Sequence, residues 1–361
     1  MKIVVPARTD RRLLNPRGDP RFPRTRYLGS KRKLISAIDG QFRGLSFTTA
    51  LDAFGGTGAV AYALKRAGKR VTYNDALAFN HQIGLALIEN DSACLSDDEI
   101  EGIGKRRGDV VYGDFIERTF RGIYFTDDEN RWLDAAVGNI ARLDGRYKRA
   151  MAWFAVFQAA MAKRPYNLFH RNNLHMRTAD VKRSFGNKAS WDRSFSDHLR
   201  VFAGEANQAV FAAGESCRAT CGDALEIDGS FDLVYVDTPY INRNGVGVDY
   251  RAFYHFLEGM VRYDEWPGLV DSRLKHAPLI REINPWSDPS TCFEAFRSLF
   301  ERFRHSHLVV SYRSDGQPSI DELLGLLRSV RNSVRVVELA RRPFALSTNN
   351  RAYELLLLAE G

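Results

Sequence analysis

Residues 49–60 read TALDAFGGTGAV, which is a short apolar strand, a turn rich in glycine and the start of a helix. A second strand is predicted over residues 69–73, and Asp75 lies just past its end. A strand, a helix and a second strand in this order open a doubly wound, mainly parallel α/β sheet. Such sheets bind ligands beyond the carboxyl ends of their strands. The glycine turn and Asp75 are therefore the first candidate site residues.

The glycine turn is suited to a ligand that lies against the backbone. Gly55, Gly56 and Gly58 have no Cβ, so a ligand can approach the chain closely. Gly56-x-Gly58-x-x-Ala61 fits the loose dinucleotide fingerprint, and Asp75 follows about where an acid would bind the ribose hydroxyls. From these residues alone, NAD and S-adenosylmethionine are both open as cofactors. The alternatives are an ordinary strand–helix turn and a helix N-cap at Asp75.

Strand patterns return in the second half of the chain. They cover residues 217–223, 231–240 and 307–314. Two last strands, residues 334–338 and 352–358, are expected to form a closing hairpin. These segments complete the sheet that residues 49–75 begin.

Helical patterns dominate the region between these two groups of strands. The clearest cover residues 132–140 and 151–162. We therefore interpret residues 95–214 as a helical insertion. The catalytic domain is predicted to consist of residues 27–94 and 215–361.

Composition bounds the class of protein. Of 361 residues, 44% are hydrophobic, which is enough for a sizeable core. No run of about 18 apolar residues occurs, and no apolar stretch follows the N-terminus, so neither a membrane span nor a signal peptide is predicted. The cysteines fit no metal-ligand spacing and are expected to be reduced thiols in a prokaryotic cytosol. They are Cys94, Cys217, Cys221 and Cys292.

The net charge of +8 favours a polyanionic partner. Basic residues are concentrated in residues 1–26, where prolines prevent a regular helix. We interpret this segment as an extended basic arm able to follow phosphates. A disordered solubilising tail is an equally good interpretation of the arm alone.

The segment Asp237-Thr238-Pro239-Tyr240 directly follows an apolar strand. An amino group on an aromatic base is a poor nucleophile because its lone pair is delocalised into the ring. A carboxylate from Asp237 and the backbone carbonyl of Thr238 can both accept hydrogen bonds from that group and orient its lone pair. Pro239 stiffens the turn, and Tyr240 can stack on a base that has left its duplex. A plain β-turn after a strand is the alternative for this segment alone.

Taken together, the motifs resemble those of the D12 class of adenine-specific DNA methyltransferases, the alpha group that includes Dam-type enzymes and type II modification methylases. The similarity covers most of the chain from Arg26 onward. The matching motifs stand in alpha-group order: YLGSK (27–31), DAFGGTGAV (52–60), YNDALAFN (73–80), CGDAL (221–225), VYVDTPY (234–240) and VVSYRS (309–314). In this chain Thr238 stands where the family has the first proline of D-P-P-Y, which keeps the backbone carbonyl but makes the turn less rigid.

The resemblance implies a Rossmann-like methyltransferase fold with an inserted helical target-recognition domain, and S-adenosylmethionine as the cofactor. It assigns cofactor binding to Tyr27, Lys31, Asp52, Phe54, Gly56, Gly58, Asp75 and Asp223. It assigns catalysis to Asp237, Thr238, Pro239 and Tyr240. No metal is required by this chemistry.

A DNA methyltransferase must also read DNA. The stretch KRPYNLFHRNNLHMR (163–177) looks like one found in a subset of type II methylases, and it mixes cations with aromatic residues. We predict that Lys163, Arg164, Arg171 and Arg177 contact DNA, together with Arg243 in the glycine-containing loop after Tyr240. A solvated helix end and a plain surface loop are the alternatives.

The expected function is methylation of N6 of a flipped adenine in double-stranded DNA, by a modification or orphan methylase in the prokaryotic cytosol or nucleoid. A cognate restriction endonuclease acting separately is a possible partner. One alternative is an enzyme of the same fold that methylates RNA or protein. Another is a catalytically impaired DNA-binding homologue. An NAD-dependent oxidoreductase leaves YLGSK and DTPY unexplained.

Overall fold

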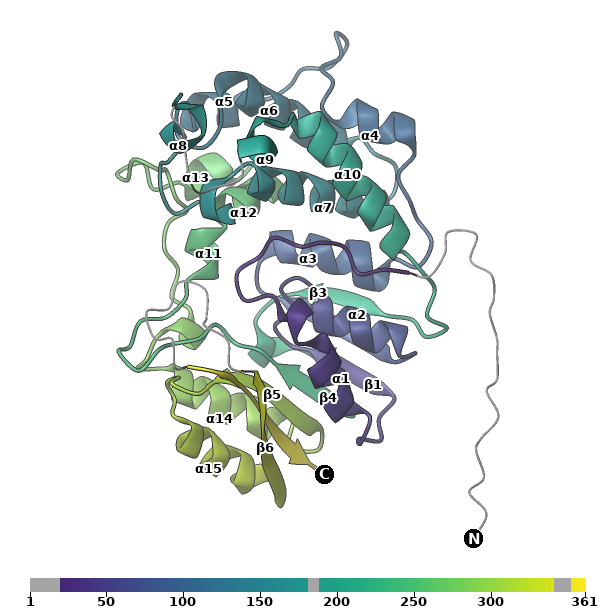
Figure 1. The fold of residues 1–361 in the computed structure, drawn as a ribbon, viewed down its shortest axis with the longest axis vertical. Helices are drawn as coiled ribbons and strands as arrows, with labels where there is room; N and C mark the ends of the chain where they lie inside the picture. The colour runs from purple at the N-terminus through teal and green to yellow at the C-terminus, as the bar shows by residue number, and fades with distance from the viewer. Residues whose placement is uncertain (1–19, 181–187, 341–351) are drawn as a thin grey trace.

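A seven-stranded sheet forms the centre of the catalytic half, with strand order β3-β2-β1-β4-β5-β7-β6 (Figure 1). The computed structural model describes residues 20–180, 188–340 and 352–361, so most of the predicted basic arm lies outside the described residues. The strands are β1 (Thr49–Asp52), β2 (Arg70–Asp75), β3 (Arg218–Cys221), β4 (Leu233–Val236), β5 (His307–Arg313), β6 (Ser333–Ala340) and β7 (Glu354–Glu360).

The first five strands in the sheet run parallel to one another, from β3 to β5. Strand β7 is antiparallel to both β5 and β6, which confirms the expected closing hairpin. In this register Asp52, the last residue of β1, lies between Tyr73 on β2 and Tyr235 on β4. The fold is therefore the mixed, mainly parallel α/β fold predicted from the sequence.

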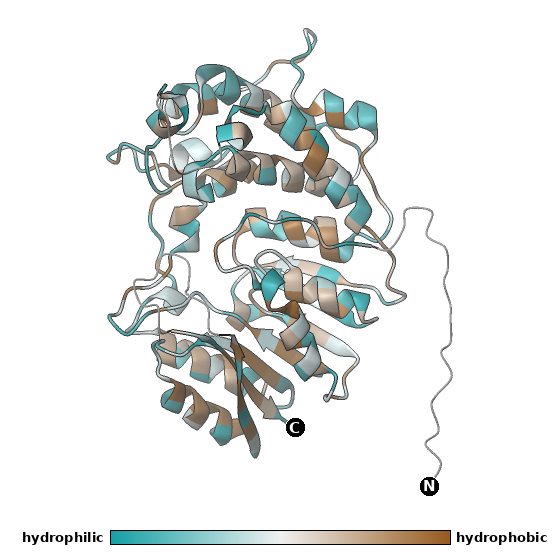
Figure 2. Ribbon diagram, in the orientation of Figure 1, coloured by the Kyte–Doolittle hydropathy of each residue, from teal (hydrophilic) through white to brown (hydrophobic). Residues whose placement is uncertain are grey.

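Successive side chains of a strand point to opposite faces of the sheet. Since helices cover both faces, these side chains belong alternately to two cores. Ala50 and Tyr235 belong to the core beneath α1, α2 and α3, whereas Leu51 and Val234 belong to the core beneath α14 and α15. The strands are accordingly among the most hydrophobic segments in Figure 2. These helices are α1 (Ile35–Phe42), α2 (Ala59–Arg66), α3 (Ala78–Gly84), α14 (Cys292–Arg302) and α15 (Ile320–Val330).

A second, helical half lies above α3 in Figure 1. Most of it comes from the predicted insertion: α4 (Asp97–Ile103), α5 (Phe115–Thr119), α6 (Asp127–Ala141), α7 (Arg146–Ala162), α8 (His175–Thr178), α9 (Lys188–Asp192) and α10 (Phe195–Ala209). The segment after Tyr240 adds α11 (Tyr250–Phe253), α12 (His255–Val261) and α13 (Trp266–Leu269). The helical half is therefore built from two separate parts of the chain.

Helix α7 joins the two halves. Every residue from Ala150 to Ala162 is buried, as expected for a helix that is apolar on all sides. It packs against α3 on the sheet side and against α10 on the other side. One continuous core consequently runs from the sheet into the helical half. No helix in the described ranges is both long and apolar enough to cross a bilayer.

The order of the strands positions a site. After β1 the chain moves to β2 on one side, and β4 lies on the other side of β1. This reversal leaves a crevice outside the carboxyl ends of β1 and β4, where open α/β sheets bind ligands.

Candidate active site

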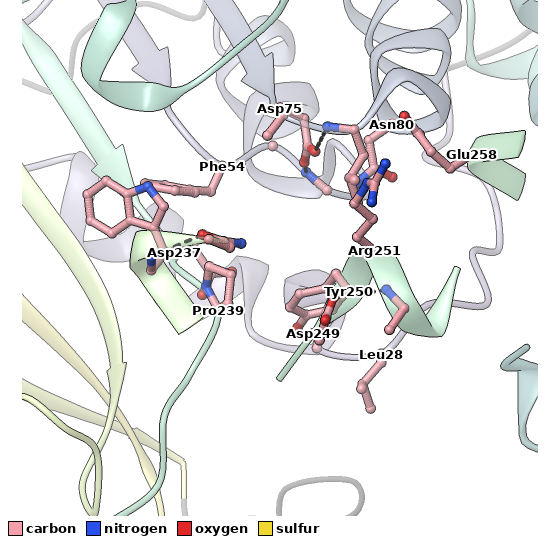
Figure 3. Close-up of a pocket in the computed structure, with 18 of the residues that line it drawn as sticks. Leu28, Phe54, Asp75, Asn80, Asp237, Pro239, Asp249, Tyr250, Arg251 and Glu258 are labelled. Carbon is pink, nitrogen blue, oxygen red and sulfur yellow. Dashed lines mark hydrogen bonds between the residues drawn. The ribbon is translucent and has the colours of Figure 1, made fainter. Parts of the chain in front are cut away.

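A cavity of about 500 Å³ occupies this crevice, a volume typical of ligand sites. It is lined by the turns that follow β1, β2, β3 and β4, and by residues of the 249–286 region. Figure 3 shows Phe54, Asp75, Asp237 and Tyr250 around one open space. The structure thus brings together residues that are more than 200 positions apart in the sequence.

The glycine turn forms one wall of the cavity. Gly56 has φ +50° and its N–H donates to Oδ2 of Asp75 at 2.9 Å. Gly58 has φ +73° and precedes the first residue of α2; these positive φ values favour glycine. At Gly55 a Cβ would lie 2.0 Å from the ring of Tyr73, so the close packing of turn and strand requires glycine there.

Asp52 presents an oxygen with unused hydrogen-bonding capacity. Its Oδ2 accepts from the N–H of Ala61 at 3.1 Å, whereas its Oδ1 is buried and has no partner among the described residues. Burial, followed by the negative charge of Asp237, raises the pKa of Asp52 to about 8. A buried carboxyl that faces a cavity in this way is suited to binding a cationic group of a ligand.

Two further carboxylates and a pair of aromatic rings line the same part of the cavity. Asp75 also accepts from the N–H of Leu77 at 2.9 Å, and burial raises the pKa of its carboxyl. Asp223 follows β3, lines the cavity and accepts from the N–H of Leu225 at 3.0 Å. Phe54 meets Trp286 edge to face, with ring centroids 4.8 Å apart. Carboxylates that accept from ribose hydroxyls and aromatic faces that contact a base suit a nucleoside.

The segment after β4 places Asp237 at the other end of the cavity. Burial raises the pKa of Asp237, although the ammonium of Lys31 opposes this shift. Oδ1 of Asp237 lies 2.8 Å from Nζ of Lys31 and accepts at 2.8 Å from the Tyr240 hydroxyl. Pro239 lines the cavity and Thr238 is buried. The structure therefore joins two predicted groups, the YLGSK lysine and DTPY, in one cluster.

Lys31 is buried between two carboxylates. Nζ of Lys31 lies 3.3 Å from Oε1 of Glu354 on β7, in addition to its contact with Asp237. Burial alone disfavours the ammonium, but the two carboxylates outweigh burial and raise the pKa of Lys31. Lys31 lines the cavity, and both of its carboxylate partners lie at the Asp237 end.

Comparison with known proteins identifies the family. The sequence profile of the D12 class of N6 adenine-specific DNA methyltransferases matches residues 27–277. The chain belongs to this class. The match covers the glycine turn, Asp75, DTPY and the helical insertion, and so includes most of the segments that line the cavity.

Individual relatives are modification methylases. The chain is 28% identical over 328 residues to the type II methyltransferase M2.HphI of Haemophilus parahaemolyticus, covering 89% of this chain and 92% of the relative. It is 28% identical over 359 residues to modification methylase StsI of Streptococcus sanguinis, covering 92% of this chain and 51% of the relative. It is 25% identical over 336 residues to modification methylase LlaI of Lactococcus lactis, covering 84% and 48%. The chain thus spans about half the length of the latter two.

Three of the cations predicted to contact DNA lie inside this methyltransferase. Lys163, Arg164 and Arg177 are 2%, 1% and 7% exposed. Lys163 and Arg177 pair with Glu129 at 2.8 and 2.7 Å, and Arg177 also donates to the carbonyl of Tyr124 at 3.0 Å. Because all three side chains are buried and donate to internal carboxylate or carbonyl groups, the predicted phosphate contacts are wrong for these three residues.

The other two predicted DNA contacts are on the surface. Arg171 and Arg243 are both exposed. Between the buried cations, Tyr166 is 63% exposed and has φ +62°, a left-handed conformation that is uncommon for a large side chain. The guanidinium of Arg164 stabilises this turn from inside by donating to the carbonyls of Leu168 and Arg171.

Four further residues line the cavity or support its walls and were not predicted from the sequence. Glu258 of α12 accepts from the N–H groups of Ala78 and Phe79 at 3.1 and 3.0 Å, and so fixes the N-terminus of α3. Tyr250 and Trp286 line the cavity, and Glu354 joins the Lys31–Asp237 cluster. The motif stretches used for prediction include none of these four residues. An acid at the start of a strictly apolar strand, ELLLLAE, was the one signal for Glu354.

Proposed function

We propose that this D12-class methyltransferase transfers the methyl group of S-adenosylmethionine to N6 of an adenine that has been flipped out of double-stranded DNA. One observation carries the proposal: a single cavity has nucleoside-binding chemistry at the Asp75 end and the amino-orienting carboxylate Asp237 at the other. A methyl donor and an exocyclic amino group bound in this cavity would face each other.

The residues of the first wall fit S-adenosylmethionine. Asp75 and Asp223 are available for the ribose and the adenine, and Phe54 with Trp286 forms an aromatic wall for the base. Oδ1 of Asp52, which has no protein partner among the described residues, suits the ammonium of the methionine moiety. When bound, this cofactor supplies a methyl group on a sulfonium, which is electrophilic without assistance from a metal.

The residues at the other end act on the adenine. Asp237 and the Thr238 carbonyl accept hydrogen bonds from the amino group, which directs the nitrogen lone pair at the methyl carbon. As the new N–C bond forms, the C–S bond breaks and its electrons go to sulfur. The nitrogen then loses one proton, for which Asp237 is the nearest base. Replacement of the family proline by Thr238 leaves all of these groups in place.

Tyr240 must move before the base can stack on it. In the structure its hydroxyl lies 2.8 Å from Oδ1 of Asp237 and 2.6 Å from Oε1 of Glu354, its ring meets Tyr312 edge to face at 5.8 Å, and it does not line the cavity. Entry of an adenine would replace the hydroxyl beside Asp237 with the amino group. A ring released in this way offers a face that offsets part of the lost base stacking.

The DNA itself would bind across the exposed residues near the cavity. Arg171 and Arg243 would contact phosphates, and the exposed ring of Tyr166 would contact bases. The family requires a DNA substrate, and its relatives are modification methylases. We therefore propose a role in restriction–modification, with a separate endonuclease as partner, in the cytosol.

The decisive experiment replaces Asp237. Asp237→Ala should abolish formation of N6-methyladenine in DNA, whereas binding of S-adenosylmethionine should change by less than about threefold. Asp228→Ala is the matched control, because the side chain of Asp228 is fully exposed. Methylation-aware sequencing of DNA from cells that express each variant gives the modified base and its sequence context. N6-methyladenine at wild-type levels in Asp237→Ala would contradict the proposal.

A further inference from the structure

The hydroxyl of Tyr240 lies between two carboxylates. It is 2.8 Å from Oδ1 of Asp237 and 2.6 Å from Oε1 of Glu354. A phenol has one hydrogen, so it can donate to only one of them. The other contact is a hydrogen bond only while that second carboxyl carries a proton. The state of Asp237 is therefore tied to the state of Glu354.

Glu354 is the better acceptor of the two. Its Oε1 is the point on which three donors converge: Tyr240 at 2.6 Å, the Ser311 hydroxyl at 2.7 Å and Lys31 at 3.3 Å. Hydrogen bonds from a hydroxyl to an ionised carboxylate fall at about 2.5–2.7 Å. Glu354 is also 7% exposed, so water does not supply these donors instead. Glu354 is therefore the point at which the donors of this cluster meet.

We propose that Glu354 is a positioning residue for methyl transfer: it draws the Tyr240 hydroxyl and part of the Lys31 charge to itself, which leaves Asp237 able to accept from the adenine amino group. This inference rests on the proposed function. Without Glu354, Lys31 and Tyr240 would both donate to Asp237 alone. The amino group would then have to displace two donors.

The charged and titratable groups around Asp237 and Glu354 come from several elements. Among the described residues, these groups are Lys31, Asp52 on β1, Tyr235 on β4, Tyr240, Tyr250 on α11 and Arg313 on β5. Lys31 pairs with both carboxylates, whereas Arg313 lies opposite Glu354 in the sheet and pairs with Asp315. Removal of the charge of Glu354 should therefore lower the pKa of Asp237, because a like charge is lost and Lys31 is left with one carboxylate partner.

The test compares Glu354→Gln with Glu360→Gln, a control on the same strand whose carboxylate pairs with Arg335 near the surface. The Asp237 carboxyl is titrated by carbon-13 NMR and assigned with Asp237→Asn and Asp52→Asn. Glu354→Gln should lower the titration midpoint of Asp237 by about one pH unit or more. It should also lower the single-turnover methylation rate about tenfold or more and move its acid limb to lower pH. Glu360→Gln should do neither.

Ser311→Ala provides a milder variant. It removes one of the three donors to Glu354 but leaves the carboxylate in place, so the Asp237 midpoint should move by less than in Glu354→Gln. A merely structural role would lower rates without moving either midpoint. Unchanged Asp237 midpoints in a methylating enzyme would overturn the inference. If the midpoints shift in the variants but the wild-type protein forms no N6-methyladenine, the coupling of Glu354 to Asp237 is upheld and the proposed function is rejected.

Discussion

Nζ of Lys31 lies 2.8 Å from Oδ1 of Asp237, although the whole helical insertion separates the two residues in the sequence. The side chain of Lys31 is 7% exposed and contacts Glu354 as well. One ammonium therefore holds the segment before α1 against the ends of β4 and β7. This contact links the stability of the sheet to the chemistry of the site.

Replacement of Lys31 by methionine should destabilise the protein by about 3–5 kcal/mol at pH 8, because it leaves two carboxylates buried without a cation. The pKa of Asp237 would rise further, so the folded state would bind more protons than the unfolded state. The destabilisation should therefore shrink as the pH is lowered from 8 to 5. Urea unfolding at several pH values measures both effects. Lys33→Met, at an exposed position, should change stability by less than about 0.5 kcal/mol.

The cofactor affinity should depend on the ionisation of Asp52. Its pKa of about 8 in the free protein means that the carboxyl is mainly protonated at pH 6–7. A cationic ligand binds the ionised form, so each binding event should release a proton, and affinity should rise as the pH goes from 6 to 7.5. Titration calorimetry in buffers of different ionisation enthalpy counts the protons. Asp52→Asn should bind S-adenosylmethionine more weakly and release none; equal proton release by this variant would reject the assignment.

The pair of aromatic rings, Phe54 and Trp286, should discriminate cofactor from DNA. Trp286→Ala removes the ring that meets Phe54 at 4.8 Å and should weaken S-adenosylmethionine binding about tenfold, since an aromatic pair contributes about 0.5–1.5 kcal/mol beyond its buried area. DNA binding without cofactor should stay within about twofold. Trp132→Ala is the control, because Trp132 lies in α6 and stacks on Phe195 instead. Equal losses of S-adenosylmethionine affinity in the two variants would argue against a contact between Trp286 and the adenosine of the cofactor.

Local patterns in the sequence predicted most of the sheet. Strand β1, the glycine turn, α2 and β2 follow one another along the chain, and each is marked by apolar residues or glycines within about ten positions. The same holds for DTPY, which directly follows β4. Contacts such as Lys31–Glu354 and Phe54–Trp286 join residues more than 200 positions apart. No pattern in one sequence determines such a contact, which is why Glu354 and Trp286 were not predicted.

Charge was the least reliable guide. Lys163, Arg164 and Arg177 have the composition of a surface that binds phosphate, yet they are buried. Glu129, the internal partner of Lys163 and Arg177, also belongs to the capping box that starts α6, where it accepts from the N–H of Thr126 at 3.0 Å. A sequence pattern shows that cations are close together, but not whether an acid from another helix faces them.

Arg164 should therefore contribute to stability. Its guanidinium donates to the Arg171 carbonyl at 2.9 Å and lies 4.4 Å from the centre of the Tyr124 ring. Arg164→Met should destabilise the protein by about 2–4 kcal/mol, because buried carbonyls lose their donors. Thermal and urea unfolding measure the loss. A change below about 0.5 kcal/mol would show that the guanidinium is not needed to hold the turn.

Arg171 should instead contribute to DNA binding. Its side chain is exposed, so Arg171→Met should leave the free energy of unfolding within about 0.5 kcal/mol of the wild type. If the side chain neutralises one phosphate, the slope of log affinity against log salt should become shallower by about 1, equally for DNA with and without a target adenine. Filter binding or fluorescence anisotropy across a salt series gives this slope. Arg164→Met, which is expected to lower stability, shows what a loss of folding does to the slope. An unaltered slope in Arg171→Met would remove Arg171 from the DNA-binding face.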